Sequence, residues 1–326
     1  MRLIFGLKNT ILFFGFLILT LFAHCQKENE IQTIAPMTVK NYEGHIHIGF
    51  WGDDNNMQIS FYPCGVNQLF AIAKVYYYST LADHKQEHAS NEFSSCTDWV
   101  GPYYVCSATS VNAGLPQQFT GGWHGSNGDG TGSPTASTSA TRFEVDGKEV
   151  NGNFELNCNQ VDLYATNLIH GYDYSKTNAN LLKESVHYTI KPSRQIDVEV
   201  RIEALDDAVI QRYYGLQSQN FSIFDQVSYL AGQQVINTAP IKADSNCKTN
   251  EGVNTILLTG NKTQHQLRVV LNVAEGLGVP GNLGDGKPKA FSASYGKSYF
   301  NLVNGKDLPL KKGEQVFWKG SYFWDE

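Results

Sequence analysis

Short segments with the character of β-strands follow one another along almost the whole chain, and this pattern limits the possible folds most. The segments His45–Phe50 (HIHIGF) and Ile196–Ala204 (IDVEVRIEA) alternate apolar and polar residues, as half-buried strands do. No amphipathic helical pattern of twelve or more residues appears, although Leu69–Tyr78 (LFAIAKVYYY) fits either a strand or a helix. We therefore predict an all-β protein, in which residues 40–326 form a single large antiparallel β-sandwich. Further strands are expected at Met57–Tyr62, Arg142–Val145, Val161–Leu168, Ser185–Ile190, Val209–Tyr214, Thr255–Leu258, Gln266–Val273 and Gln315–Phe323.

The first 25 residues have the features of an export signal. Arg2 and Lys8 precede the apolar run Ile11–Phe22, which is short for a membrane span and typical of a signal peptide. Cleavage before Cys25, with a lipid on its sulfur, would give a cell-surface or periplasmic lipoprotein. Ordinary cleavage after Cys25 would give a secreted protein, so both alternatives predict export. The polar residues 26–39 are expected to form a tether.

Composition restricts the partners that such a protein can have. Aromatic residues reach 12% of the chain while charged residues are only 17%, which is too much apolar surface for a disordered protein. The formal net charge is −6 and no basic block is present, so nucleic acid is excluded as a partner. An acidic chain rich in glycine, asparagine and aromatic residues fits the binding of a polysaccharide or oligosaccharide. Membrane attachment is expected only through a lipid on Cys25.

Five cysteines follow Cys25, and an odd number leaves at least one thiol unpaired. They are Cys64, Cys96, Cys106, Cys158 and Cys247. Cys96 and Cys106 flank a segment with a central Gly-Pro that could bring its ends together, so we predict a disulfide between these two. No Cys-x-x-Cys or Cys/His spacing indicates structural zinc, and no cofactor is expected.

A long segment of small and polar residues, Gly121–Thr141 (GGWHGSNGDGTGSPTASTSAT), contains the pair Trp123-His124. One interpretation is a flexible surface loop. The other is a functional loop, because a tryptophan and a histidine are costly in an idle mobile segment. Asn127 and Asp129 could bind calcium, but their spacing matches no known calcium loop.

Two further groups of side chains could line a sugar site. His170 and Tyr172 follow a strand pattern and begin a polar turn, where aromatic rings can stack on a pyranose. Tyr213 and Tyr214 should point to opposite faces of a strand, so only one of them can line a concave site. Arg212 could pair with the carboxylate of an acidic sugar. The motifs of serine hydrolases, nucleotide-binding proteins and thermolysin-like zinc enzymes are absent.

The segment from Gly121 to Gln217 resembles the galactose-mutarotase-like supersandwich, the fold of aldose epimerases and of a domain of several polysaccharide lyases. The first shared feature is the glycine-rich turn Gly121–Gly125 (GGWHG), and the second is the strand pair Lys183–Ile190 and Ile196–Ala204 around a short turn. The third is a loop leading into Tyr213–Gln217 (YYGLQ), where mutarotases carry an Asn…His motif that this chain lacks. The resemblance implies the fold and sugar recognition, and the missing histidine argues against epimerase activity.

These observations favour an exported polysaccharide-degrading enzyme, a lyase acting by β-elimination. That reaction needs a base, an acid and a group that neutralises the uronate carboxylate. The expected catalytic residues are His124, His170 and Tyr214, and the expected substrate-binding residues are Trp123, Tyr172, Gln217 and Arg212. The alternatives are a glycoside hydrolase, or a carbohydrate-binding surface lipoprotein without catalysis. The resemblance implies that Trp123 and His124 lie about 10 Å from Tyr214 or Gln217, with His170 and Tyr172 completing the wall.

Overall fold

The computed structural model describes residues 37–51, 56–78, 92–94, 96–219, 223–261, 263 and 265–325. The expected signal peptide and Cys25 lie outside these ranges. Residues Ala35–Glu326 form one compact unit, in which strand pairing begins at Met37, inside the segment expected to be a tether. No helix in the described part of the chain is long and apolar enough to cross a membrane.

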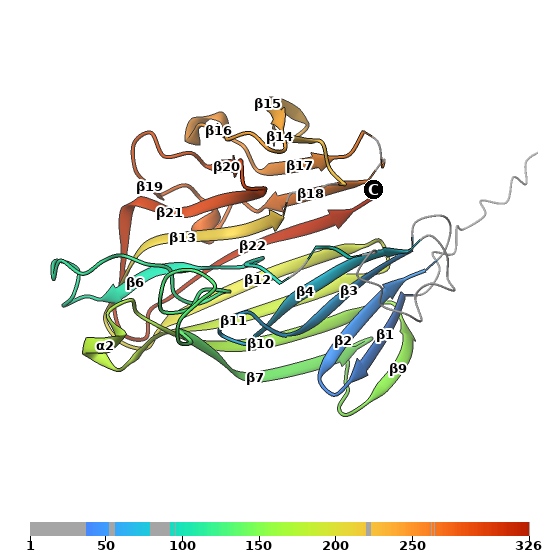
Figure 1. Cartoon of the computed structure of the whole chain (residues 1–326), viewed down its shortest axis with the longest axis horizontal. Coiled ribbons are helices and arrows are strands. Elements are labelled where there is room, and N and C mark those ends of the chain that lie inside the picture. Colours follow the sequence, from blue (N-terminus) through green and yellow to red (C-terminus); the bar gives the residue numbers. More distant parts are fainter. Residues whose placement is uncertain are drawn as a thin grey trace, which may run out of the picture. The chain divides into compact units, whose positions relative to one another are not determined.

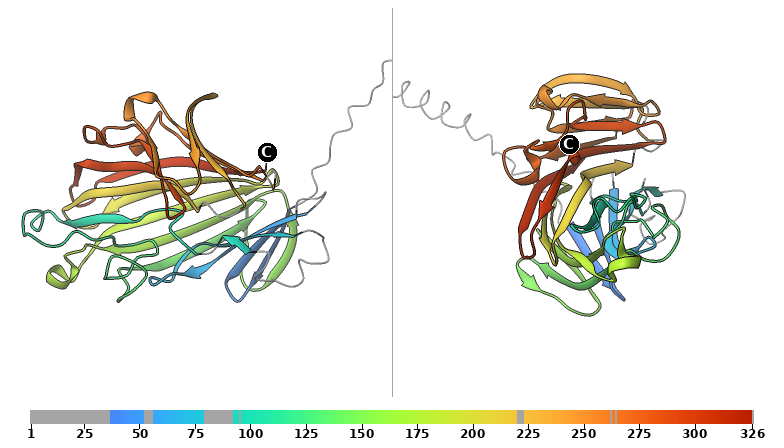
Figure 2. Two further views of the ribbon diagram at one scale, coloured as in Figure 1. Left: turned by 45° about the horizontal axis from the view of Figure 1, so that its top comes forward. Right: turned by 90° about the vertical axis from the view of Figure 1, so that its left-hand side faces the viewer.

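The prediction of an all-β fold built from large antiparallel sheets is confirmed (Figures 1 and 2). Helical structure in the described residues is limited to short segments between strands. These are α2 (Tyr174–Thr177) and the 3₁₀ turns η3 (Thr249–Glu251) and η4 (Gly276–Gly278).

The largest sheet has ten antiparallel strands and runs through the whole compact unit (Figure 1). Its centre is the expected hairpin of β11 and β12, paired in register from Leu182↔Ala204 to Lys191↔Gln195. In order across the sheet its strands are β15 (Gln234–Pro240), β14 (Gln226–Ala231), β17 (Thr255–Thr259), β18 (Gln266–Leu271), β22 (Gln315–Trp324), β12 (Gln195–Ala204), β11 (Asn180–Lys191), β10 (Val161–His170), β7 (Ala136–Val145) and β8 (Lys148–Glu149).

Two smaller sheets complete the fold. The first contains β5 (Glu92–Ser94), β4 (Leu69–Tyr78), β3 (Asn56–Cys64), β2 (His45–Phe50), β1 (Met37–Tyr42) and β9 (Phe154–Cys158). The second contains β16 (Ser245–Cys247), β20 (Ala290–Ala293), β21 (Lys297–Leu310), β13 (Ala208–Gln219) and β6 (Tyr103–Ser107), with β19 (Asn282–Leu283) parallel to β21.

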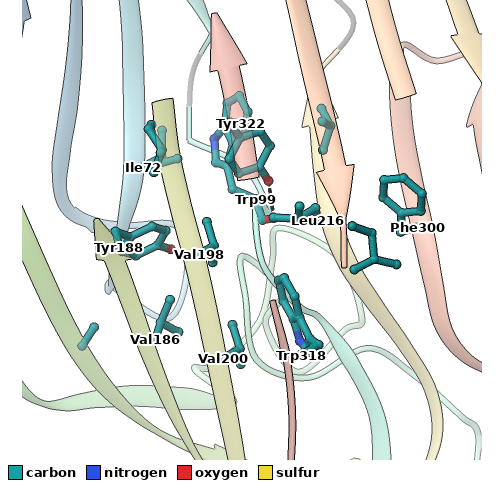
Figure 3. Packing of buried hydrophobic residues seen from close by; sticks show 14 of the residues in the cluster. Ile72, Trp99, Val186, Tyr188, Val198, Val200, Leu216, Phe300, Trp318 and Tyr322 are labelled. Carbon is teal, nitrogen blue, oxygen red and sulfur yellow. Dashed lines mark hydrogen bonds between the residues drawn. The ribbon is translucent and has the colours of Figure 1, made fainter. Parts of the chain in front are cut away.

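Both smaller sheets pack on the same face of the large sheet. Phe61 of β3 meets Tyr188 of β11 edge to face, with ring centroids 5.2 Å apart. Figure 3 shows Leu216 of β13 and Phe300 of β21 in the same packed cluster as Trp318 of β22. Within this cluster Trp318 Nε1 donates to the Tyr213 hydroxyl at 2.7 Å, as buried tryptophans usually find a partner for this group.

The alternation along β12 explains why only one face of the large sheet is covered. Val198, Val200 and Ile202 are buried in the core, whereas Glu199 and Arg201 point to the opposite face and pair with each other at 2.6 Å. The large sheet therefore has an apolar inner face and a polar outer face, as antiparallel sheets with one solvated side do.

Leu69–Tyr78, for which the sequence left a strand and a helix open, is the largely buried strand β4 and pairs with β3 and β5. One expectation about local structure changes. Strand β7 begins at Ala136, so the last part of the glycine-rich segment pairs with β10 instead of forming a loop.

The predicted Cys96–Cys106 disulfide is wrong, because Cys96 pairs with Cys64 at the end of β3, with Cα atoms 6.1 Å apart. The chain after Cys96 does not fold back on itself. It continues into β6, where Cys106 pairs in register with Val209 of β13 and its thiol is buried and free. Burial raises the pKa of the Cys106 thiol, which keeps it in the unreactive protonated form.

Candidate functional site

A pocket of about 320 Å³ lies between the second small sheet and the glycine-rich loop. Its walls are formed by Thr97, Asp98, Pro102, Phe119, Trp123, His124, Tyr214, Gln217, Tyr295, Lys297 and Tyr299. The structure thus brings together Trp123, His124, Tyr214 and Gln217, which are about 90 residues apart in the sequence and were expected to share one site.

An irregularity in β13 puts both Tyr214 and Gln217 on the pocket side. Strict alternation would place residues three apart on opposite faces of the strand. The pairing with β21 moves from Tyr214↔Asn301 to Gln217↔Tyr299, three residues on one strand against two on the other. This bulge returns Gln217 to the face of Tyr214. Tyr213 points the other way and is fully buried, as the alternation predicted.

The side-chain amide of Gln217 has no hydrogen-bond partner. The residue is fully buried, yet neither Oε1 nor Nε2 is bonded to another protein atom. Its backbone is held firmly, since its N–H donates to Trp99 O at 3.2 Å and its carbonyl accepts from the Tyr322 hydroxyl at 2.8 Å. An unsatisfied buried amide costs roughly 1–3 kcal/mol. A pocket ligand offering a donor and an acceptor would remove this cost.

Asp98 is the electrostatic centre of the pocket. One of its carboxylate oxygens accepts the Trp123 N–H, and the other lies 3.3 Å from His124 Nδ1 and 3.4 Å from Lys297 Nζ. Burial by itself would raise the pKa of Asp98. The Lys297 charge, the contact with His124 and the Trp123 N–H outweigh burial and lower this pKa to about 2. Asp98 is therefore ionised at neutral pH, although its side chain is only 2% exposed.

The pocket also changes the ionisation of its other groups. Burial lowers the pKa of Lys297, and the neighbouring Asp98 carboxylate partly opposes this effect. Burial raises the pKa of Tyr214 to about 12, while the Arg212 guanidinium beside it acts in the opposite direction. Burial likewise raises the pKa of Tyr299, whose hydroxyl lies 2.7 Å from that of Tyr295. Both phenols are protonated at neutral pH.

The glycine-rich loop is anchored at several points and positions His124. The Asn67 amide donates to the carbonyl oxygens of Gly122 and His124 at 2.9 and 2.8 Å, and its oxygen accepts the Thr135 N–H at 2.6 Å. Thr135 Oγ1 donates to His124 O at 2.6 Å. Gly122 has a φ of +52°, and a Cβ there would lie 2.1 Å from Asp98 Oδ1. The loop is thus a fixed part of the site.

The Cys64–Cys96 disulfide links the two segments that organise the pocket. Cys64 lies three residues before Asn67, which holds the loop, and Cys96 lies two residues before Asp98. The bond ties the acidic centre to the loop anchor.

Trp123 forms one wall of the pocket, and its indole is confined by two glycines. A Cβ at Gly65 would come within 2.7 Å of the indole, and one at Gly130 within 2.0 Å. The ring also meets the His124 ring edge to face at 5.9 Å. These contacts fix the orientation of the indole ring in the pocket wall.

His170 and Tyr172 do not line the pocket, in contrast to the expectation. The β10–β11 pairing shifts at His170, and the chain then turns into α2. The His170 ring stacks on Tyr174 at 3.7 Å, and the Tyr172 hydroxyl donates to Gln211 at 2.7 Å. The catalytic role expected of His170 and the binding role expected of Tyr172 therefore find no support in the pocket. Arg212 lies beside Tyr214 but is not part of the pocket wall.

Several pocket residues were not found from the sequence. Asp98 and Lys297 are 199 positions apart and belong to no motif. The only sequence signal for either residue was that Asp98 lies two positions after Cys96. The possible calcium ligand Asp129 accepts two bonds from Thr131, at 2.8 and 2.6 Å. The described residues contain no cluster of three or more His, Cys, Asp or Glu side chains suited to a metal.

No protein-family model matches the sequence, and no curated protein matches it. Solved structures similar to this chain include the GH36 α-galactosidase AgaA from Geobacillus stearothermophilus in complex with raffinose, with 8% identity and a TM-score of 0.48 over 86% of this chain and 40% of that one. Galactose 1-epimerase from Lactobacillus acidophilus NCFM has 10% identity and a TM-score of 0.35 over 88% and 97%. The chain spans about 40% of the α-galactosidase. These likenesses concern the fold alone.

Proposed function

We propose that this protein is an exported carbohydrate-active enzyme that cleaves a uronate-containing polysaccharide by β-elimination in the pocket around His124. The observation that carries the proposal is the arrangement of an ionised, buried Asp98 beside the His124 ring, with Tyr214 and the unbonded Gln217 amide in the same pocket. This combination provides a base, an acid and a polar group that needs a ligand.

His124 has the role of the base in this proposal. The Asp98 carboxylate next to Nδ1 favours a proton on that nitrogen, which leaves Nε2 to accept one. His124 Nε2 removes the proton from C5 of the uronate. The electrons form the C4–C5 double bond as the bond from C4 to the leaving oxygen breaks. Tyr214, which keeps its proton at neutral pH, donates it to the leaving oxygen.

Lys297 and Gln217 would stabilise the negative charge that develops on the uronate carboxylate. Lys297 supplies a cation whose side chain is only 13% exposed, and such a charge acts strongly because little water screens it. Gln217 can donate a hydrogen bond from Nε2 at no cost to any existing bond.

The alternative functions have less support. A glycoside hydrolase commonly uses two carboxylates about 5–10 Å apart, and Asp98 is the only carboxylate among the described residues that line the pocket. A binding protein without catalysis would be served by a flat aromatic surface. Here a histidine and tyrosines share a half-open pocket instead.

A screen of the mature protein against a panel of polysaccharides tests the proposal. We expect uronate polymers, and not neutral ones, to yield the conjugated unsaturated product that is detected by its ultraviolet absorbance. New reducing ends without that absorbance would indicate a hydrolase. Binding without any product would indicate a binding protein.

We also propose that the protein is exported and anchored through a lipid on Cys25. The support is the sequence of residues 1–25. Cells producing the protein should retain it in the membrane fraction, and Cys25→Ser should release it or block its maturation. A mature N-terminus at Gln26 without lipid would show that the protein is secreted instead.

A further inference from the structure

We propose that a second sugar subsite lies next to the pocket, where Tyr104 and Phe119 form the floor and Arg212 binds an anionic group of the neighbouring sugar residue. The inference rests on the proposed function, because it assumes that the pocket itself holds a sugar. It narrows the substrate to an anionic oligosaccharide or polymer with at least two residues bound.

A continuous set of aromatic rings extends from the pocket to this second subsite. The centre of the Phe119 ring lies 5.1 Å from that of His124 and 5.5 Å from that of Tyr214. On its other side, the centre of the Tyr104 ring lies 4.1 Å away. Phe119, Tyr214 and Tyr104 are all half-buried, so each ring keeps accessible surface. Aromatic faces of this kind stack on the C–H bonds of sugar rings. The rings therefore continue a sugar-binding surface beyond the pocket.

Arg212 stands at the end of this surface. It pairs in register with Tyr104 across β13 and β6, and its guanidinium lies 4.8 Å from the centre of the Tyr104 ring. It also lies beside Tyr214, on which it acts electrostatically. The cation is thus held between the subsite floor and the proposed proton donor.

Arg212 differs from three other arginines, which each pair with a carboxylate. Arg142 pairs with Glu144, Arg194 with Asp325 at 3.6 Å and Arg201 with Glu199 at 2.6 Å. In the described part of the chain no carboxylate pairs with Arg212, and its buried Nε has no hydrogen-bond acceptor. A half-buried guanidinium without an anion is costly. A carboxylate or sulfate presented in its plane would satisfy it with two parallel hydrogen bonds.

The position of the Arg212 cation determines where the substrate must carry negative charge. Lys297 lies 3.4 Å from Asp98 inside the pocket, whereas Arg212 lies over Tyr104, beside the pocket, and no carboxylate of the described residues pairs with it. An anionic group on the sugar next to the cleaved one would meet Arg212. We therefore expect the protein to prefer a polysaccharide with negative charge on adjacent sugar residues over one with an isolated uronate.

Binding measurements with the inactive His124→Ala protein test the subsite separately from the chemistry. The probes are tetrasaccharides of three kinds with matched length: polyuronates, sulfated neutral sugars and unmodified neutral sugars. Titration calorimetry gives each dissociation constant. We expect at least one anionic tetrasaccharide to bind at least about tenfold more tightly than any neutral one, and the comparison of uronate with sulfate identifies which anion Arg212 receives.

Changes at Arg212 should act on the anionic tetrasaccharide only. Arg212→Gln should weaken its binding about tenfold or more and reduce the salt dependence of binding, and Arg212→Lys should recover part of the loss, since it restores the charge but not the planar pair of donors. Arg201→Gln, on the outer face of the large sheet, is the matched control and should change binding less than about twofold. Tyr104→Ser provides a second variant of the floor, in case Arg212→Gln does not fold.

The subsite proposal is overturned if no anionic tetrasaccharide binds, if neutral ones bind equally well, or if Arg212→Gln has no more effect than Arg201→Gln. If the anionic tetrasaccharide binds through Arg212 while the unchanged enzyme releases no unsaturated product, the subsite stands and the β-elimination proposal fails.

Discussion

Among the histidine–aspartate pairs of the described residues, the one in the pocket and the one on the outer face of the large sheet have different surroundings. On the outer face, His187 Nε2 lies 2.8 Å from Asp162 Oδ1, and the His187 ring stacks on Tyr164 at 4.2 Å. In the pocket, His124 lies 3.3 Å from Asp98. By distance alone, the outer pair is the better formed.

The surroundings of the two pairs distinguish them. Asp162 shares its charge with neutral donors such as Thr189, and His187 is 33% exposed on a strand of regular pairing. Asp98 is 2% exposed and faces a buried lysine, in a pocket that also contains an unbonded buried amide. A histidine beside an aspartate is therefore a weak sign of a catalytic site. Burial of charge and unsatisfied polar groups are a stronger one.

The largest expected difference between the two pairs is in turnover. His124→Ala should reduce the rate of polysaccharide cleavage about 10²–10⁴-fold, because it removes the proposed general base. His187→Ala should leave the rate within about twofold, since surface changes away from the site have small effects. Circular dichroism and thermal unfolding of both variants show whether either has lost the fold. Equal loss of activity in the two variants would mean that the pocket pair has no special role in catalysis.

Acid stability should also separate the two aspartates. The pKa of Asp98 is about 2 in the folded protein against an ordinary value of 3.8. Ionised Asp98 thus stabilises the fold above pH 3.8, and this stability is lost as the pH falls through about 2, a contribution of about 2 kcal/mol by linkage. Denaturant unfolding between pH 5 and pH 2 should show a smaller loss for Asp98→Asn than for the unchanged protein.

Asp162→Asn serves as the control for this measurement. Burial raises the pKa of Asp162, while hydrogen bonds from Gln160, Thr189 and His187 lower it by more, so the net shift has the same sign as for Asp98. The side chain of Asp162 is 6% exposed against 2% for Asp98, and neutral donors such as Thr189 share its charge, so its removal should reduce the loss of stability in acid by less. The opposite order would mean that Lys297 does not hold the Asp98 charge.

Trp123 and Phe317 offer a comparison of aromatic surfaces. Trp123→Ala should weaken substrate binding by roughly 1–2 kcal/mol, because it removes a stacking face in the pocket. Phe317 lies on the outer face, where the Arg201 guanidinium is 5.8 Å from its ring centre, and Phe317→Ala should not affect binding. The test is the dissociation constant of an oligosaccharide with each variant. Loss of binding in Phe317→Ala would mean that the oligosaccharide binds on the outer face.

The smallest expected effect concerns stability at Gln217. Gln217→Leu should leave the free energy of unfolding unchanged or raise it by up to about 1 kcal/mol, since it removes an unsatisfied buried amide. The same variant should bind substrate more weakly. If it instead destabilises the protein and binds normally, the Gln217 amide has a structural partner and no role towards ligands.

The sequence predicted the parts of the site that depend on local pattern. Strand alternation separated Tyr213 from Tyr214, and the glycine-rich turn identified Trp123 and His124. It did not predict the bulge that turns Gln217 to the pocket, because the bulge is defined by pairing with β21, and β21 itself was not recognised. His170 was misplaced for a similar reason: a shift in pairing at the end of β10 sends it away from the pocket.

The resemblance implied that the glycine-rich turn lies near Tyr214 and Gln217, but contacts between distant segments that it does not cover were not predicted. The disulfide joins Cys96 to Cys64, across the loop closure of 32 residues, instead of to the nearer Cys106. Lys297 reaches Asp98 only because β21 lies next to β13 in the folded sheet (Figure 1). Residues without motifs are positioned by such tertiary neighbours, and nothing in their own sequence indicates it.

The location of a bound substrate tests the central claim most directly. A crystal structure of the His124→Ala protein with an anionic oligosaccharide should show a sugar in the pocket, within hydrogen-bond distance of the Gln217 amide and beside Tyr214 and Lys297. A sugar bound on the outer face near His187 and Asp162, with the pocket occupied by water alone, would contradict the account.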